Sequence, residues 1–221
     1  MISFYEYLRN LPKLHSWDGG KTWNTGGFEV RHLRAMHELT TRFFPHGGDI
    51  IETGAGNSTV TFLLSGPGKL TSVCTTQSTL DGVASYCLTN DVPTDCFEPV
   101  CGRSEWVLND IARSDRRFDI ALIDGGHGWP TVFVDFFHLN YMLTQGGFII
   151  LDDLQLHSIN ELGRLLFNER AKFELVQKID KVAIFQKGTD DRYAGDWFEQ
   201  TYIREMSERI ASNATRFDLS Y

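Results

Sequence analysis

The stretch that decides the fold, residues 49–59, reads DIIETGAGNST. A short apolar run ends at Glu52, glycines follow at positions 54 and 56, and Ser58 opens a helical pattern. Glycines let the backbone approach a ligand closely, and the start of a helix offers unpaired N–H groups to an anion. The stretch therefore predicts a β-strand that runs into a ligand-binding turn and then into a helix.

Strand-length apolar runs alternate with helical patterns along the chain. After residues 49–53, further runs lie at 70–75, 96–100, 118–124 and 146–153. Such alternation implies right-handed crossovers and a parallel sheet with helices on both faces. Residues 173–188 hold two more strands with almost no connection, which indicates an antiparallel hairpin. We therefore predict an α/β fold: a doubly wound, mostly parallel, Rossmann-like sheet of seven strands with an antiparallel terminal hairpin and extra N- and C-terminal helices.

The 221 residues are expected to form one domain, since they are many for a minimal domain and few for two. Its core spans residues 46–188, and SINE at 158–161 has the form of a helix capping box. Residues 1–45 hold two helical patterns, joined by a Gly- and Trp-rich segment (16–27) that is either a lid or a plain surface connection. The C-terminal extension, 189–221, caps the domain or packs on a second subunit, so the terminal helices allow a homo-oligomer.

The composition excludes several classes of partner. A formal net charge of −8 and a pI near 5.3 argue against nucleic acid, because nucleic-acid binders present a basic face. No apolar run approaches the roughly 20 residues that span a bilayer, and no signal peptide is recognisable, so we expect a cytoplasmic protein with no membrane partner. The four cysteines lack C-x-x-C spacing and are expected to be free thiols, with disulfides or a metal site as the alternative.

Carboxylates stand at the ends of two predicted strands. Asp124 ends the fourth strand, and Asp152 and Asp153 end the fifth. The carboxyl ends of adjacent parallel strands meet at one edge of a sheet, where ligands bind. Carboxylates held together repel each other unless they share a cation or protons, and oxygen ligands suit Mg²⁺. The sequence thus predicts a magnesium site, with a loop-orienting Asp124 and a turn-capping Asp153 as the alternative.

His127 lies three residues after Asp124, on a Gly-Gly turn that faces the same edge of the sheet. A histidine at such a place is a candidate general base, since imidazole changes protonation near neutral pH. The alternative is an ordinary histidine of a surface loop.

Three stretches together resemble the class I S-adenosylmethionine (SAM) dependent methyltransferases: IIETGAGNST, FDIALIDGGH and GGFIILDD. More narrowly, the chain is similar to the small metal-dependent O-methyltransferases, the catechol and macrolide-sugar types included, over about residues 26–188. The resemblance implies an enzyme that methylates a hydroxyl of a small molecule, a sugar or a natural product, with SAM and Mg²⁺ as cofactors.

The resemblance also implies roles for individual residues. The residues expected to bind SAM are Glu52, Gly54, Gly56 and Ser58 at the methionine part, Ser104 and Glu105 at the adenine, and Asp124. The expected metal ligands are Asp124, Asp152 and Asp153, with His127 as the catalytic base. Aromatic rings are expected to line the acceptor pocket: those of Trp17, Trp23, Trp129 and His157.

One departure concerns the ribose. The resembling enzymes carry an acid at the end of the second strand, whereas this chain has no carboxylate there, so Thr76 or Gln77 is expected to make that hydrogen bond. An NAD-linked oxidoreductase would need the same acid and a third glycine where this chain has Thr59. Two more classes of protein would share the fold: a metal-independent methyltransferase that uses His127 alone, and a non-catalytic SAM-fold binding protein.

Overall fold

The computed structural model describes residues 2–16, 18, 20–189 and 195–213. Its centre is a seven-stranded sheet of order β3–β2–β1–β4–β5–β7–β6. The strands are β1 Asp49–Thr53, β2 Lys69–Cys74, β3 Phe97–Cys101, β4 Phe118–Ile123, β5 Leu143–Leu151, β6 Phe173–Ile179 and β7 Val182–Lys187. Strands β1 to β5 pair in parallel, and β7 runs antiparallel to both β5 and β6. The predicted sheet and its terminal hairpin are confirmed.

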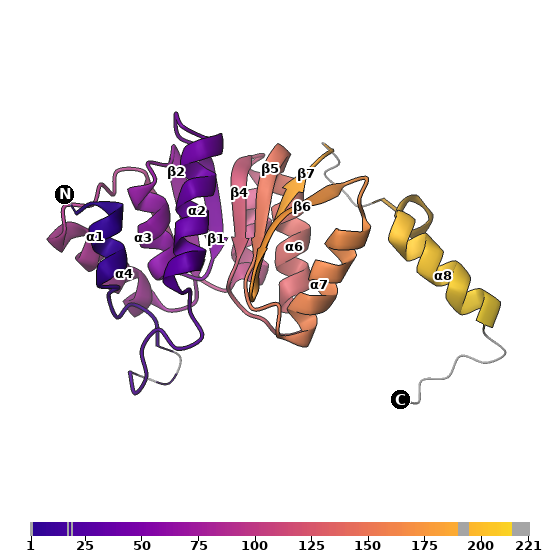
Figure 1. Cartoon of the computed structure of the whole chain (residues 1–221), viewed down its shortest axis with the longest axis horizontal. Coiled ribbons are helices and arrows are strands. Elements are labelled where there is room, and N and C mark those ends of the chain that lie inside the picture. Colours follow the sequence, from indigo (N-terminus) through magenta and orange to yellow (C-terminus); the bar gives the residue numbers. More distant parts are fainter. Residues whose placement is uncertain (1, 17, 19, 190–194, 214–221) are drawn as a thin grey trace.

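Helices cover both faces of this sheet (Figure 1). One layer contains α1 Phe4–Arg9, α2 Val30–Phe43, α3 Asn57–Leu64 and α4 Gln77–Thr89. The opposite layer contains α5 Ser104–Arg113, α6 Thr131–Met142 and α7 His157–Asn168. Neighbouring residues of a strand point to opposite faces, so Ile50 packs into the first layer and Ile51 into the second. Both faces are buried, which is why the central strands read as continuous apolar runs.

The two terminal additions are attached differently. Helix α1 joins the first layer, where the buried Tyr7 hydroxyl donates to Oδ1 of Asn57 at 2.8 Å. Helix α8, Thr201–Asn213, follows a 3₁₀ turn at Trp197–Glu199 and projects away from the core (Figure 1). Its first N–H groups, of Thr201 and Tyr202, donate to the Glu169 carboxylate at 3.1 and 2.6 Å. Self-association through the terminal helices stays a prediction.

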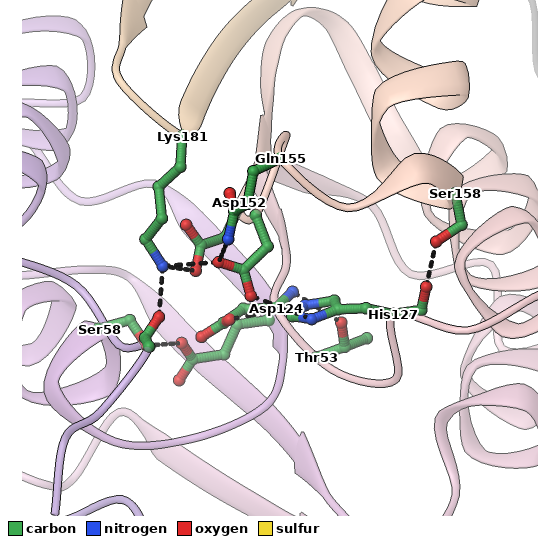
Figure 2. A network of polar contacts seen from close by, with 11 residues as sticks. Thr53, Ser58, Asp124, His127, Asp152, Gln155, Ser158 and Lys181 are labelled. Carbon is green, nitrogen blue, oxygen red and sulfur yellow. Dashed lines mark hydrogen bonds and ion pairs between the residues drawn. The ribbon is translucent and has the colours of Figure 1, made fainter.

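The capping box expected at residues 158–161 does not form. Helix α7 begins at His157, one residue after Leu156, and its N-cap makes no side-chain hydrogen bond. The Ser158 hydroxyl donates instead to the backbone carbonyl of His127 (Figure 2). The prediction was wrong because a hydroxyl that can cap a helix can also donate to any carbonyl that the tertiary fold brings near.

Two expectations about the chain as a whole can be compared with the structure. Within residues 2–16, 18, 20–189 and 195–213, no helix is long and apolar enough to cross a membrane. All four cysteines are free thiols, with Cys87 buried and Cys101 exposed.

Candidate active site

The carboxyl ends of β1, β4 and β5 meet where the strand order reverses. Thr53 pairs with Ile123, and Ile123 pairs with Leu151, so the three strands end level with one another. The next residues continue this alignment: the N–H of Asp124 donates to the Thr53 carbonyl at 3.1 Å, and the N–H of Asp152 donates to the Ile123 carbonyl at 3.2 Å. Ligands of open α/β sheets bind at such a reversal of strand order. The structure therefore places Asp124 and Asp152 side by side at this edge of the sheet.

A pocket of about 760 Å³ opens at this edge. Its walls come from the β1–α3 turn, the end of β2, the start of α5, the β4–α6 loop and the segment 24–28. The predicted site residues that line it are Gly54, Gly56, Ser58, Thr76, Ser104, Asp124, His127 and Asp153. Volumes of several hundred Å³ are typical of cofactor and small-molecule sites. The pocket therefore has room for a ligand the size of SAM, and the glycine turn leaves backbone exposed to it.

Glu52 does not line this pocket and lies fully buried beneath it. Its carboxylate accepts hydrogen bonds from the hydroxyls of Ser58, Thr59 and Ser72 at 2.7, 2.5 and 2.6 Å. Burial raises the pKa of Glu52 to about 7, although the three hydroxyls act in the opposite direction. The expected direct contact with the cofactor is replaced by a supporting role, since Glu52 holds the start of α3 against β1 and β2.

Gly54 is required by the backbone around it. Its φ is +93°, and a Cβ built there would lie 2.4 Å from the carbonyl oxygen of Asp124. A side chain at this position would therefore collide with the backbone just after β4. The glycine thus permits the close approach of the β1 turn to Asp124.

Some of the residues expected to bind the adenine and ribose of SAM line the pocket, whereas others form hydrogen bonds outside it. Thr76 and Ser104 line it, and the Ser104 hydroxyl donates to Oδ2 of the buried Asp135 at 3.0 Å. Gln77 turns away and donates to Asp81 at 2.8 Å. Of the two residues expected to replace the ribose-binding acid, only Thr76 faces the pocket.

Glu105 is also engaged outside the pocket. Its carboxylate pairs with the Arg103 guanidinium at 2.7 Å and accepts from the Thr131 hydroxyl at 2.9 Å. The hydrogen bond from Arg103 holds the pKa of Glu105 at about 2. This carboxylate links α5 to the start of α6, and it is not part of the pocket lining.

Asp124, Asp152 and Asp153 form an acidic cluster at the strand ends. A lysine that no sequence motif indicates lies among them. Lys181 lies in the turn between β6 and β7, and its ammonium is 2.9 Å from Oδ2 of Asp152 and 2.8 Å from Oδ1 of Asp153 (Figure 2). Burial raises the pKa of Asp124, and the neighbouring Asp152 raises it further. Burial acts against charge on Asp153 too, but hydrogen bonds from His127 and Lys181 hold its pKa well below the usual range. The surroundings thus favour the neutral form of Asp124 and the ionised form of Asp153.

These side chains do not fit a metal ion as they lie. Among the described residues, no group of three or more His, Cys, Asp and Glu side chains is arranged to hold one. A Mg²⁺ ion would need oxygens at about 2.0–2.1 Å. One oxygen of each neighbouring carboxylate, Oδ2 of Asp152 and Oδ1 of Asp153, is already hydrogen-bonded to the Lys181 ammonium.

His127 reaches into the pocket from the β4–α6 loop. Its Nδ1 lies 3.1 Å from Oδ2 of Asp153, and its Nε2 lies 3.9 Å from Oδ1 of Asp124. Nε2 makes no hydrogen bond within the described part of the chain. A carboxylate on Nδ1 favours the tautomer that carries the proton there, which leaves the Nε2 lone pair free to accept a proton.

The described aromatic residues that were expected to line an acceptor pocket do not line the pocket at the strand ends. Trp23 and Trp129 are 43% and 77% exposed, and His157 is exposed at the start of α7. None of these three lines the pocket, and Trp17 lies outside the described residues. Phe28 does line it. The local sequence could not distinguish these rings, because all of them lie in loops or at a helix end.

Comparisons with known proteins agree with the fold described above. Residues 51–154 match the model of a methyltransferase domain family. Among solved structures, the fold is similar to an O-methyltransferase from Bacillus cereus in complex with SAH (16% identity, TM-score 0.60, 73% of this chain and 83% of that one). It is also similar to the O-methyltransferase TomG from Streptomyces achromogenes in complex with SAM (14% identity, TM-score 0.58, 74% of this chain and 82% of that one). A third similar structure is the methyltransferase MycE with Mg, SAH and mycinamycin VI (16% identity, TM-score 0.57); the match covers 81% of this chain and 56% of MycE.

Residues 51–154 thus resemble a methyltransferase domain, and the fold is similar to that of solved O-methyltransferases. No curated protein sequence matches this chain.

Proposed function

We propose that this chain transfers a methyl group from SAM to a hydroxyl of a small molecule, with His127 as the general base. The observation that carries the proposal is the His127–Asp153 pair at the pocket: Nδ1 is held at 3.1 Å by a carboxylate, and the buried Nε2 has no hydrogen-bond partner among the described residues. A general base needs one ring nitrogen fixed in this way and a second one that makes no hydrogen bond of its own.

The chain's own residues would divide the work of the reaction. SAM, when bound, supplies a methyl group on a positively charged sulfonium. The glycine turn, Thr76 and Ser104 line the space for it, and the acids at the strand ends suit a cationic donor. His127 would take the proton of the acceptor hydroxyl at Nε2, and Asp153 would stabilise the imidazolium that results. A positioned base of this kind contributes about 10²–10⁴ in rate.

The acceptor is proposed to be a hydroxyl of a sugar or another natural product. The support is similarity of fold: MycE was solved with mycinamycin VI, and TomG is involved in tomaymycin synthesis. A panel of small hydroxyl compounds, followed by mass spectrometry for a gain of one methyl group, tests this choice.

Two versions of the reaction remain, one with magnesium and one without. The structure of MycE with Mg and the three aspartates at the strand ends favour the first. The ammonium of Lys181 on Asp152 and Asp153 favours the second. Methyl transfer measured before and after EDTA separates them: the magnesium-assisted version predicts loss of turnover, and the metal-independent version predicts none.

Isothermal titration calorimetry with S-adenosylhomocysteine tests the cofactor. We expect one molecule bound per chain, and binding weakened by Thr76→Val. Binding of NADH in place of S-adenosylhomocysteine would contradict the proposal and favour an oxidoreductase.

A further inference from the structure

We propose that Lys181 is the resident cation of the acidic cluster: its ammonium stands where a divalent metal would otherwise bind, and it positions Asp153 and the segment 24–28 around the pocket. The inference deepens the proposed function, and its assignment of a cation to the cluster rests on contacts of this chain alone.

The fold brings Lys181 to the cluster. Strand β7 returns beside β5, so the two-residue turn at 180–181 lies next to the residues that follow β5. The Lys181 carbonyl accepts the N–H of Leu154 at 2.9 Å, which fixes the turn to the loop directly after Asp153. The side chain is only 17% exposed, so its ammonium is directed inward.

All three ammonium protons have acceptors. Two go to Oδ2 of Asp152 and Oδ1 of Asp153, at 2.9 and 2.8 Å, and the third goes to the carbonyl of Gly26. The ammonium also lies 5.6 Å from the centre of the Phe28 ring. Oxygens converge on this nitrogen as they would on a bound cation, so a metal ion and the ammonium compete for the same lone pairs.

A cation offsets the negative charge of the cluster. Asp152 is 1% exposed, and Asp124 and Asp153 lie beside it at the pocket. Buried carboxylates at short distance are costly without a positive partner. Lys181 is the partner that the fold itself provides.

The same ammonium connects two parts of the site. The two oxygens of Asp153 have different partners: Oδ1 pairs with the Lys181 ammonium, and Oδ2 pairs with Nδ1 of His127. Gly26 belongs to the segment 24–28, which also lines the pocket. Lys181 is therefore a positioning residue: it orients the carboxylate that orients the base, and it holds the glycine-rich segment against the sheet edge.

Mn²⁺ is the probe for a divalent cation site, read from the electron paramagnetic resonance signal of the free ion with the full chain and no SAM. The wild-type chain is expected to leave the signal unchanged at millimolar Mn²⁺. Lys181→Ala frees both carboxylate oxygens and should bind one Mn²⁺ per chain. Adding Asp152→Asn to that variant should abolish the gain.

Three control variants accompany the measurement. Lys181→Arg keeps a cation and should bind no Mn²⁺. Lys178→Ala removes an exposed ammonium of the same hairpin and should also bind none. Lys181→Gln keeps most of the side-chain stem, so it reports Mn²⁺ binding where Lys181→Ala does not fold, which circular dichroism checks.

The inference is overturned if wild-type protein binds Mn²⁺ and Asp152→Asn removes that binding. It is equally overturned if folded Lys181→Ala and Lys181→Gln bind no more Mn²⁺ than wild type. Neither result depends on SAM or an acceptor, whereas the calorimetry with S-adenosylhomocysteine tests the proposed function. The two failures are therefore distinguishable.

Discussion

Nδ1 of His127 lies 3.1 Å from Oδ2 of Asp153. The two residues come from different loops, after β4 and after β5, and meet because those strands are parallel neighbours that end level. The pairing fixes the proton on one ring nitrogen, while the other has no hydrogen-bond partner among the described residues. The chemistry proposed for this protein depends on that pair.

His127→Ala is expected to lower the methyl-transfer rate by about 10²–10⁴ with little change in affinity for S-adenosylhomocysteine, because the ring acts on the acceptor. His127→Lys should retain part of the activity, since lysine can also accept the proton when neutral. Single-turnover kinetics and calorimetry measure the two quantities. His46→Ala, in an exposed turn, is the control. Full turnover of His127→Ala would show that the histidine only shapes its loop.

Asp153→Asn is expected to slow methyl transfer by roughly 10- to 10⁴-fold. The asparagine amide can donate to Nδ1 and so shift the ring proton to Nε2, where it blocks proton acceptance. The rate constant should fall more than the affinity for the cofactor changes. Asp110→Asn, on the exposed side of α5, serves as the matched control. An unchanged rate for Asp153→Asn would mean that Asp153 does not orient the base.

Glu52→Gln should flatten the pH dependence of the free energy of unfolding. In the folded protein the pKa of Glu52 is raised from 4.5 to about 7 by burial, so the folded state binds the proton more tightly than the unfolded chain does. Stability from this group is therefore lost as the pH rises from 4.5 to 7. For wild type, the loss in the free energy of unfolding from this group is about 3 kcal/mol. Because glutamine cannot ionise, Glu52→Gln should not show this loss.

Urea unfolding across this pH range measures the slope, with Glu174→Gln, an exposed carboxylate of β6, as the control. Equal slopes for wild type and Glu52→Gln would show that the pKa of Glu52 is the same in the folded protein as in the unfolded chain.

Gly54→Ala should destabilise the whole domain. The positive φ of +93° alone costs about 1–3 kcal/mol for a residue with a Cβ, and the Cβ would meet the Asp124 carbonyl at 2.4 Å. The midpoint of urea unfolding should therefore decrease. Gly82→Ala is a control with the opposite sign: this glycine lies within α4 with open space around it, so alanine should stabilise by about 0.5–1 kcal/mol. A Gly54→Ala variant as stable as wild type would refute the backbone explanation.

Thr76→Val should weaken S-adenosylhomocysteine binding by roughly 2- to 10-fold, the value of one neutral hydrogen bond. Gln77→Ala should leave binding unchanged, because the Gln77 amide is directed to Asp81 outside the pocket. Calorimetry on the two variants decides which residue replaces the ribose-binding acid. A larger loss for Gln77→Ala than for Thr76→Val would reverse the assignment.

Much of the fold could be predicted from local pattern alone. Strands buried on both faces are apolar throughout, and the helices between them have apolar residues at helical spacing. The order of strands and helices can therefore be predicted from the sequence. The positions of Asp124 and Asp152 followed as well, because equal ends of neighbouring parallel strands meet. The capping box predicted at Ser158 does not form because its hydroxyl donates to the His127 carbonyl instead.

The direction of individual side chains could not be predicted in this way. Glu52 near the end of β1 and Gly54 just after that strand are two residues apart, yet the carboxylate lies beneath the pocket and the glycine lines it. Gln77 follows Thr76 directly and turns away from the pocket. Which of two adjacent polar side chains faces a ligand depends on the neighbouring elements that compete for its hydrogen bonds.

Local periodicity and parallel strand order are sufficient to predict the layered α/β domain, the edge of the sheet where the candidate site lies and the three aspartates at that edge. The cation that meets these aspartates could be identified only from the three-dimensional fold. Lys181 is 28 residues beyond Asp153 in a hairpin turn, where a lysine is ordinarily solvent-exposed. The antiparallel return of β7 beside β5 brings its ammonium to the carboxylates, and a long-range pairing of this kind leaves no mark in the local pattern.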